Sequence, residues 1–169
     1  GVLLPRSGAL AFIGQSCQRG ADIAPALLRE MYGVEVELMN ADIESNVDVA
    51  RSRAEKLVNE GAQVLMGAFD SGPTVAIAQV AEQRKVPLVV NIAAAPQLTE
   101  QGYKYTFRNF TSAAELIRNG LALTRDVFQA TKAAPRSAVF LHVNDTFGVS
   151  MAKGIAAILP TLTYLPFKI

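Results

Sequence analysis

The chain has 169 residues, of which half are hydrophobic and 18% are charged, and this composition indicates a compact domain rather than a disordered or fibrous chain. The formal net charge is +1 and no basic tract occurs, so no nucleic-acid partner is expected. A single cysteine excludes an internal disulfide framework and a multi-cysteine zinc site. No apolar run approaches the ~20 residues of a membrane span.

Short apolar stretches alternate with helical patterns along the whole length. The predicted strands are Val2–Leu4, Val34–Met39, Gln63–Met66, Pro87–Asn91 and Ala138–His142. They lack the polar alternation of a half-exposed sheet, which favours strands that are covered on both faces. Strands separated by helices in this way predict an α/β fold, namely a doubly wound parallel sheet with right-handed crossovers.

Helix boundaries follow from caps and breakers. The predicted helices run from about Cys17 to a stop at Gly33, from a Ser45/Asp48 capping box to Gly61, from about Ser71 onward with Pro73 in the first turn, from Ser112 to Thr131, and from Thr146 to Leu159. The segment after Pro160 reads as a strand or crossover that lacks a following helix. We therefore expect residues 1–160 to form one ligand-binding lobe and 161–169 to begin a crossover to a second lobe.

Ligands of open α/β sheets bind beyond the carboxyl ends of the strands, where the strand order changes direction. For the order 2-1-3-4-5, this crevice lies between the first and third strands, beside the loop that contains Phe69, Asp70 and Ser71. Ser71 can cap the third helix, whose free N–H groups can also hold a carboxylate; a plain N-cap is the alternative. Asp70 is a ligand acceptor or a solvated loop carboxylate, and Phe69 stacks on a ligand or packs in the core.

Enzyme signatures are missing from the sequence. It contains no G-x-G-x-x-G after the first strand, no phosphate-binding P-loop and no G-x-S-x-G. His142 and Asp145 lie near each other in sequence, but no recognisable nucleophile accompanies them. A Rossmann-like enzyme that uses this pair is thus one rival interpretation, and the ligand-binding domain of a sensor or receptor is another. We expect no enzymatic activity, no metal and no cofactor.

Several short segments, in this order and spacing, resemble one family. They are Ser7-Gly8 followed by Gly14, Gly67 to Thr74, Val86 to Val89, Leu98 to Tyr103 with Phe107-Arg108, and Asp145 to Gly148. Together they resemble the amino-terminal lobe of the type I periplasmic solute-binding proteins that serve branched-chain amino-acid-type ABC transporters. The resemblance implies a periplasmic, two-lobed clamp that closes on a small solute and delivers it to an ABC permease in the membrane.

The resemblance also implies the site residues. In the family, a serine and backbone amides at a helix start hold the ligand carboxylate, and Ser71 has that position. The loop after the fourth strand, Ile92 to Ala94, supplies backbone contacts, with Ala94 in place of the usual threonine.

Two aromatic positions of the family also differ: Phe147 replaces a tyrosine, and Ile13 replaces another aromatic residue. Each replacement removes a polar group and makes the site more apolar. These changes favour a small aromatic carboxylate over a branched-chain or other amino acid. We also expect that a leader sequence precedes this segment in the complete protein.

Overall fold

The computed structural model describes residues 1–133, 135 and 137–161. By its contacts, the chain divides into two compact units. The first contains Gly1–Ala93 and Gln97–Phe110, and the second contains Ala94–Pro96 and the chain from Thr111 onward. The division falls at residue 110, inside the lobe predicted over 1–160, so the assignment of both units to one lobe stays a prediction.

A five-stranded parallel sheet forms the centre of the first unit. Its strands are β1 (Val2–Leu4), β2 (Asn40–Asp42), β3 (Leu65–Gly67), β4 (Leu88–Val90) and β5 (Thr106–Arg108). The spatial order is β2-β1-β3-β4-β5, and every pair is parallel. The predicted fold class, a doubly wound α/β sheet, is confirmed.

Two predicted strands are wrong. The second strand begins at Asn40 and not at Val34, because its partner β1 begins at Val2, which pairs with Asn40 and leaves the earlier residues no neighbour. Ala138–His142 is not a strand in the structure; the fifth position is taken by Thr106–Arg108. Residues 91–105 connect β4 to β5.

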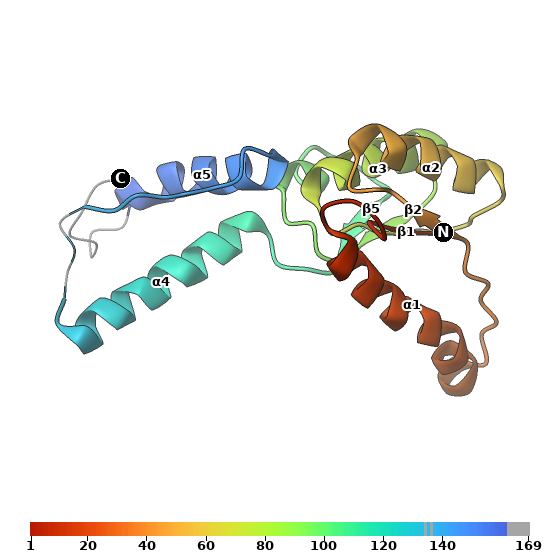
Figure 1. Cartoon of the computed structure of the whole chain (residues 1–169), viewed down its shortest axis with the longest axis horizontal. Helices are drawn as coiled ribbons and strands as arrows, with labels where there is room; N and C mark the ends of the chain where they lie inside the picture. The colour runs from red at the N-terminus through yellow and green to blue at the C-terminus, as the bar shows by residue number, and fades with distance from the viewer. Residues whose placement is uncertain (134, 136, 162–169) are drawn as a thin grey trace. The chain divides into compact units, whose positions relative to one another are not determined.

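Helices cover the two faces of the sheet unequally. Helices α2 (Val47–Asn59) and α3 (Ser71–Arg84) pack against each other on one face, and α1 (Ala11–Tyr32) lies on the opposite face (Figure 1). The predicted stop at Gly33 is confirmed, since this residue is left-handed with φ 66°. The predicted Ser45 cap of α2 is wrong: the Asn46 side chain accepts the N–H groups of Asp48 and Val49.

The face that α1 covers becomes more exposed from β1 towards β5. Val2 is 2% exposed and packs with Ala21 and Cys17 of α1, whereas Met66 is only partly buried. Farther along the same face, Val89 is 36% and Phe107 is 56% exposed. Helix α1 therefore covers β1 fully and leaves β4 and β5 largely open on this side.

The second unit contains α4 (Ala113–Thr131), α5 (Thr146–Ile158) and a short 3-10 helix, η2 (Leu159–Thr161); another, η1 (Pro96–Leu98), follows β4. Helices α4 and α5 pack against each other (Figure 1). The predicted start of α4 is confirmed by a capping box between Ser112 and Glu115. The predicted crossover lies outside the described residues except for Thr161, which ends η2.

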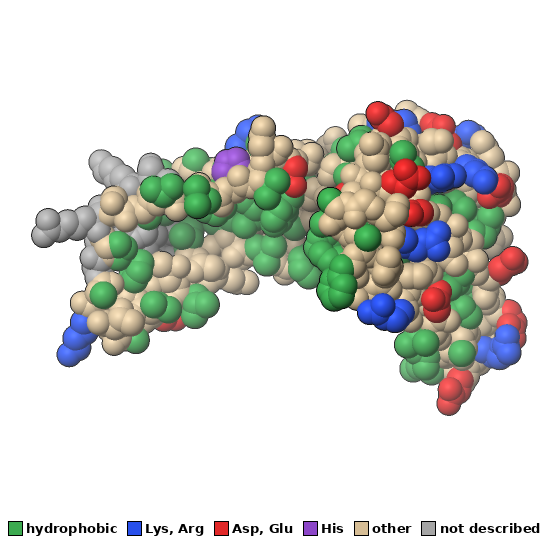
Figure 2. All heavy atoms as spheres, in the orientation of Figure 1, with side chains coloured by type: hydrophobic (Ala, Val, Ile, Leu, Met, Phe, Trp, Pro, Cys, Tyr) green, Lys and Arg blue, Asp and Glu red, His purple; other side chains and the backbone are tan. Residues whose placement is uncertain are grey.

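Charged side chains of both signs are interspersed over the visible surface of the first unit, so no extended patch of one sign appears on that face (Figure 2). Among the described residues, no helix is long and apolar enough to cross a membrane.

Candidate ligand site at the carboxyl ends of the strands

The loops that follow β1, β3 and β4 begin at the same edge of the sheet, because the three strands are parallel. From β1 the chain first crosses to β2 on one side and later continues to β3 on the other. The strand order therefore changes direction between β1 and β3, the position at which open α/β sheets bind ligands. The predicted site residues Phe69, Asp70 and Ser71 follow β3 and therefore lie at this position.

Ser71 is the first residue of α3, which follows β3 after a three-residue connection, and it is only 3% exposed. The N-cap is Asp70, with extended backbone angles (φ −81°, ψ 135°). The carbonyl oxygen of Asp70 accepts both the Thr74 hydroxyl at 2.6 Å and the Thr74 N–H at 3.1 Å. The prediction that Ser71 is the capping residue is therefore wrong, and Ser71 lies buried in the first turn.

The start of α3 carries backbone donors. The first N–H groups of a helix have no acceptor within the helix. Because Pro73 has no N–H and the Thr74 N–H is bound by Asp70, the amides of Ser71 and Gly72 are the donors of this first turn. They lie at the positive end of a 14-residue helix, where a carboxylate is stabilised by hydrogen bonds and by the helix dipole.

Glycine allows β3 to approach β1 closely just before this turn. Gly67 has φ 141°, and a Cβ atom there would clash with the carbonyl oxygen of Leu3. Ala68, directly after it, is fully buried. The Gly67-Ala68 sequence thus brings Phe69 and Asp70, both partly buried, to the edge of the sheet.

Helix α1 starts against the loop that follows β1. A Cβ atom on Gly14 would clash with the carbonyl group of Pro5, so only glycine lets the helix pack this closely. The neighbouring Ile13 is partly buried, whereas Phe12 is 83% exposed. Ile13, Phe69, Asp70 and Ser71 therefore all belong to the first unit and lie in or beside the loops after β1 and β3.

The loop after β4 is divided between the two units. Ile92 is partly buried and Ala93 is 1% exposed, and both belong to the first unit. Ala94 is 3% exposed and belongs to the second unit, where its carbonyl oxygen accepts the N–H of Ala113 at 3.0 Å. The loop after β4 therefore contributes residues to both units.

Phe147 also belongs to the second unit. It is the second residue of α5 and is 41% exposed, and Asp145 caps this helix by accepting the Gly148 N–H at 2.7 Å. Phe147 follows the segment Ala138–His142, which was predicted as a strand; because this segment is not a strand of the sheet, Phe147 does not follow a strand of that sheet. Its contact with a ligand stays a prediction.

Asp42 is a structural residue of the site that the sequence reasoning missed. Its Oδ1 atom accepts three backbone N–H groups, from Arg6 at 2.9 Å, Ser7 at 3.2 Å and Glu44 at 2.9 Å. Burial alone would raise the pKa of the Asp42 carboxyl, but these hydrogen bonds and that of the Ser7 hydroxyl outweigh it and lower the pKa. An acidic residue at the end of an edge strand was the available signal.

His142 and Asp145, the pair considered for a Rossmann-like enzyme, interact with residues close to them in the sequence. His142 is exposed, stacks on Phe140 with ring centroids 5.8 Å apart, and has its Nδ1 atom 2.9 Å from the Val143 carbonyl oxygen. Asp145 caps α5. In the described part of the chain, no group of three or more His, Cys, Asp or Glu side chains is placed to hold a metal ion.

Known proteins are similar to this chain in sequence and in fold. The sequence profile described as periplasmic binding protein matches residues 1–164. A Leu/Ile/Val-binding protein homolog (homolog 7) from Brucella abortus is 34% identical over 112 residues, which cover 64% of this chain and 28% of that protein. The chain thus spans about a third of the length of the curated relatives it matches.

Solved structures agree with this match. The leucine binding protein LivK from Thermotoga maritima is 27% identical with a TM-score of 0.81, over 99% of this chain and 46% of that one. An ABC transporter solute-binding protein from R. palustris, in complex with benzoate, is 25% identical with a TM-score of 0.76, over 95% of this chain and 44% of that one.

A parallel sheet in the order β2-β1-β3-β4-β5 with helices on both faces defines the class of doubly wound α/β folds, in which ligands bind at the carboxyl edge of the sheet. The match over residues 1–164 makes the assignment specific: the chain belongs to the periplasmic binding protein family. The relatives named above are binding proteins of ABC transporters or of amino acids, and none is an enzyme by its name.

Proposed function

We propose that the complete protein is the extracytoplasmic solute-binding component of an ABC importer, and that it binds a small carboxylate between two lobes. The start of α3 is the observation that carries this proposal. It combines the buried Ser71 with the amide donors of Ser71 and Gly72 at the position where α/β sheets bind ligands. The partners proposed are the second lobe and a membrane permease.

We further propose that the ligand is an aromatic acid. Ile13, Ala94 and Phe147 carry apolar or aromatic side chains, which have no hydroxyl or charge for an ammonium group. A solute-binding protein that is 25% identical was solved with benzoate, and another with 4-hydroxybenzoate at the same identity. Both observations support a ligand whose carboxylate binds the helix start while its ring contacts apolar side chains.

A branched-chain amino acid is the second candidate. The curated relatives carry the name Leu/Ile/Val-binding protein homolog, and LivK from Thermotoga maritima is a leucine binding protein. An amino acid requires a partner for its ammonium group, which an acidic side chain of a second lobe would have to supply. The two candidates therefore differ in whether a positive charge on the ligand strengthens or weakens binding.

Calorimetry on the complete protein distinguishes the candidates. Benzoate and leucine share the carboxylate and differ in the ring and the ammonium group, so they form a matched pair. We expect benzoate to bind at least tenfold more tightly than leucine. If leucine binds more tightly, the proposed ligand is an amino acid and not an aromatic acid. If the protein binds neither benzoate nor leucine nor any other small carboxylate, the proposed function is contradicted.

A further inference from the structure

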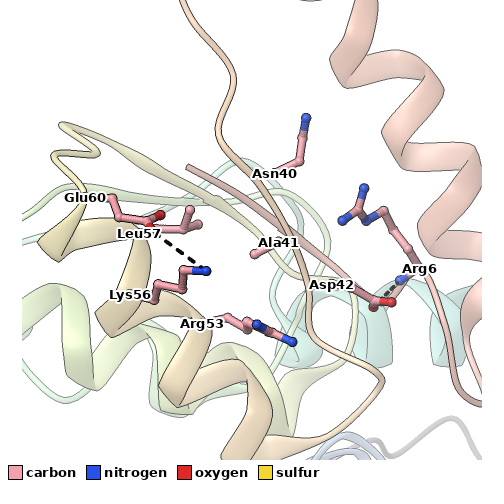
Figure 3. Close-up of a pocket in the computed structure, with 8 residues that line it drawn as sticks. All are labelled: Arg6, Asn40, Ala41, Asp42, Arg53, Lys56, Leu57 and Glu60. Carbon is pink, nitrogen blue, oxygen red and sulfur yellow. Dashed lines mark hydrogen bonds and ion pairs between the residues drawn. The ribbon is translucent and has the colours of Figure 1, made fainter.

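A pocket of about 230 Å³ lies along the outer edge of β2 (Figure 3). Strand β2 is the edge strand of the sheet, so this pocket opens beside it and includes none of the residues proposed above to contact the solute. Its lining residues come from the loop after β1, from β2 and from α2: they are Arg6, Asn40, Ala41, Asp42, Arg53, Lys56, Leu57 and Glu60.

Three of the lining side chains are cationic, and they lie on both sides of β2. Arg6 extends on one side, while Arg53 and Lys56 project from α2 on the other (Figure 3). Within the described residues, the buried Nε of Arg6 has no hydrogen-bond acceptor. A buried guanidinium N–H without an acceptor is unfavourable unless an anion or water supplies one. The Nε atom of Arg6 is such a donor, and the described side chains around it supply no acceptor.

The carboxylates near the pocket do not meet this need. The Oδ1 atom of Asp42 already accepts three backbone N–H groups. Arg53 lies 3.7 Å from Glu44, and Lys56 lies 3.7 Å from Glu60, and all four side chains are 42–60% exposed. Exposed ion pairs of this length contribute little, so both cations can turn to a ligand at small cost.

The edge strand β2 adds backbone donors to the pocket, and two buried apolar residues form its base. The hydrogen bonds Val2 N–H to Met39 O and Ile43 N–H to Leu4 O direct the odd-numbered residues of this segment towards β1. The backbone N–H groups of Asn40 and Asp42 therefore face the outer edge. The buried Ala41 and Leu57 form an apolar base.

We propose that this pocket binds a small oxyanion, which is a carboxylate or a phosphate. Arg6 donates charge-assisted hydrogen bonds to the anion, and Arg53 and Lys56 balance its charge from α2. The proposal does not depend on the proposed transport function, because the pocket lies wholly within the first unit and uses none of the solute contacts.

Amide NMR on this chain tests the proposal with inorganic phosphate and acetate as separate probes, each against sodium chloride of equal ionic strength. We expect saturable shifts at Asn40, Asp42 and along α2 with at least one probe, and none with chloride. The probe that saturates identifies the source of the oxyanion. Shifts that never saturate, or that equal those in chloride, would overturn the proposal.

Charge-removing variants locate the anion. Arg6→Gln is expected to weaken binding about tenfold, since it removes a hydrogen bond to a charged group, and Arg53→Gln with Lys56→Gln weakens it further. Lys104→Gln is the matched control, because this exposed lysine precedes β5 at the opposite edge of the sheet. Unchanged affinity in Arg6→Gln, or equal losses in Lys104→Gln, would place the anion elsewhere and overturn the proposal.

Discussion

Replacing Asp42 by alanine tests how the loop after β1 is held. The substitution removes the acceptor of three backbone N–H groups, those of Arg6, Ser7 and Glu44. A net contribution of about 0.5–1.5 kcal/mol for each bond, with some of the lost bonds replaced by water, predicts a loss of about 2–4 kcal/mol in the free energy of unfolding. Asp42→Asn keeps an oxygen acceptor and should therefore lower the free energy of unfolding by less than Asp42→Ala.

The effect depends on pH with a definite sign. Because the folded protein lowers the pKa of Asp42, its ionised form stabilises the fold at pH values above the unfolded pKa of about 3.9, and this stabilisation is lost as the pH falls through the lower folded pKa. The difference in the free energy of unfolding between the parent and Asp42→Ala should therefore have its full size at pH 7 and become smaller at pH 3 and below.

Urea titrations followed by the amide signals of the first unit measure this difference. Asp22→Ala is the control, because Asp22 is an exposed carboxylate that accepts a hydrogen bond from the Gln18 side chain. It should change the free energy of unfolding by less than about 0.5 kcal/mol. A loss below about 0.5 kcal/mol in Asp42→Ala at pH 7, or a loss that grows on acidification, would refute the reasoning.

Three further predictions follow. Gly14→Ala should destabilise the first unit by about 1–3 kcal/mol because the new Cβ meets Pro5, whereas Gly20→Ala, with open space around it, should not; equal urea midpoints would contradict this. Asn46→Ala should cost about 1 kcal/mol by removing the cap of α2, and no change in the midpoint would contradict the cap. Phe147→Ala in the complete protein should weaken benzoate more than leucine in calorimetry, and equal losses would exclude ring stacking.

The sequence predicted the elements that local patterns determine. The stop of α1 at Gly33 and the start of α4 at Ser112 follow from residue types that favour helix ends, and both were predicted correctly. The cap of α2 was placed one residue early because Ser45 and Asn46 are both good caps by residue type. Only the backbone, which is left-handed at Ser45, separates the two.

Strand pairing could not be read from local sequence. Val34–Met39 carries apolar residues suited to a strand, but pairing begins only at Asn40, where β1 offers a neighbour. Ala138–His142 is more apolar than Thr106–Arg108, yet only the latter pairs with β4. Which segment occupies an edge depends on contacts between distant residues, and these are invisible in a single segment.

The candidate site was predicted in part for the same reason. Ser71 was placed correctly at the start of α3, since a serine after a strand and before a proline marks a helix start. Its role as the cap was wrong because Asp70 takes that position. Asp42 was missed because its three backbone donors come from two different loops, which the fold brings together.

The central claim is that the start of α3 holds the carboxylate of the solute. Calorimetry of benzoate binding to the complete protein and to its Ser71→Ala variant tests it most directly, with Ser112→Ala, which caps α4, as a serine control. Loss of a hydrogen bond to a charged group, about 1.5–3 kcal/mol, predicts affinity about ten- to a hundredfold weaker in Ser71→Ala and near the parent value in Ser112→Ala. Binding of benzoate by Ser71→Ala as tightly as by the parent would contradict the claim.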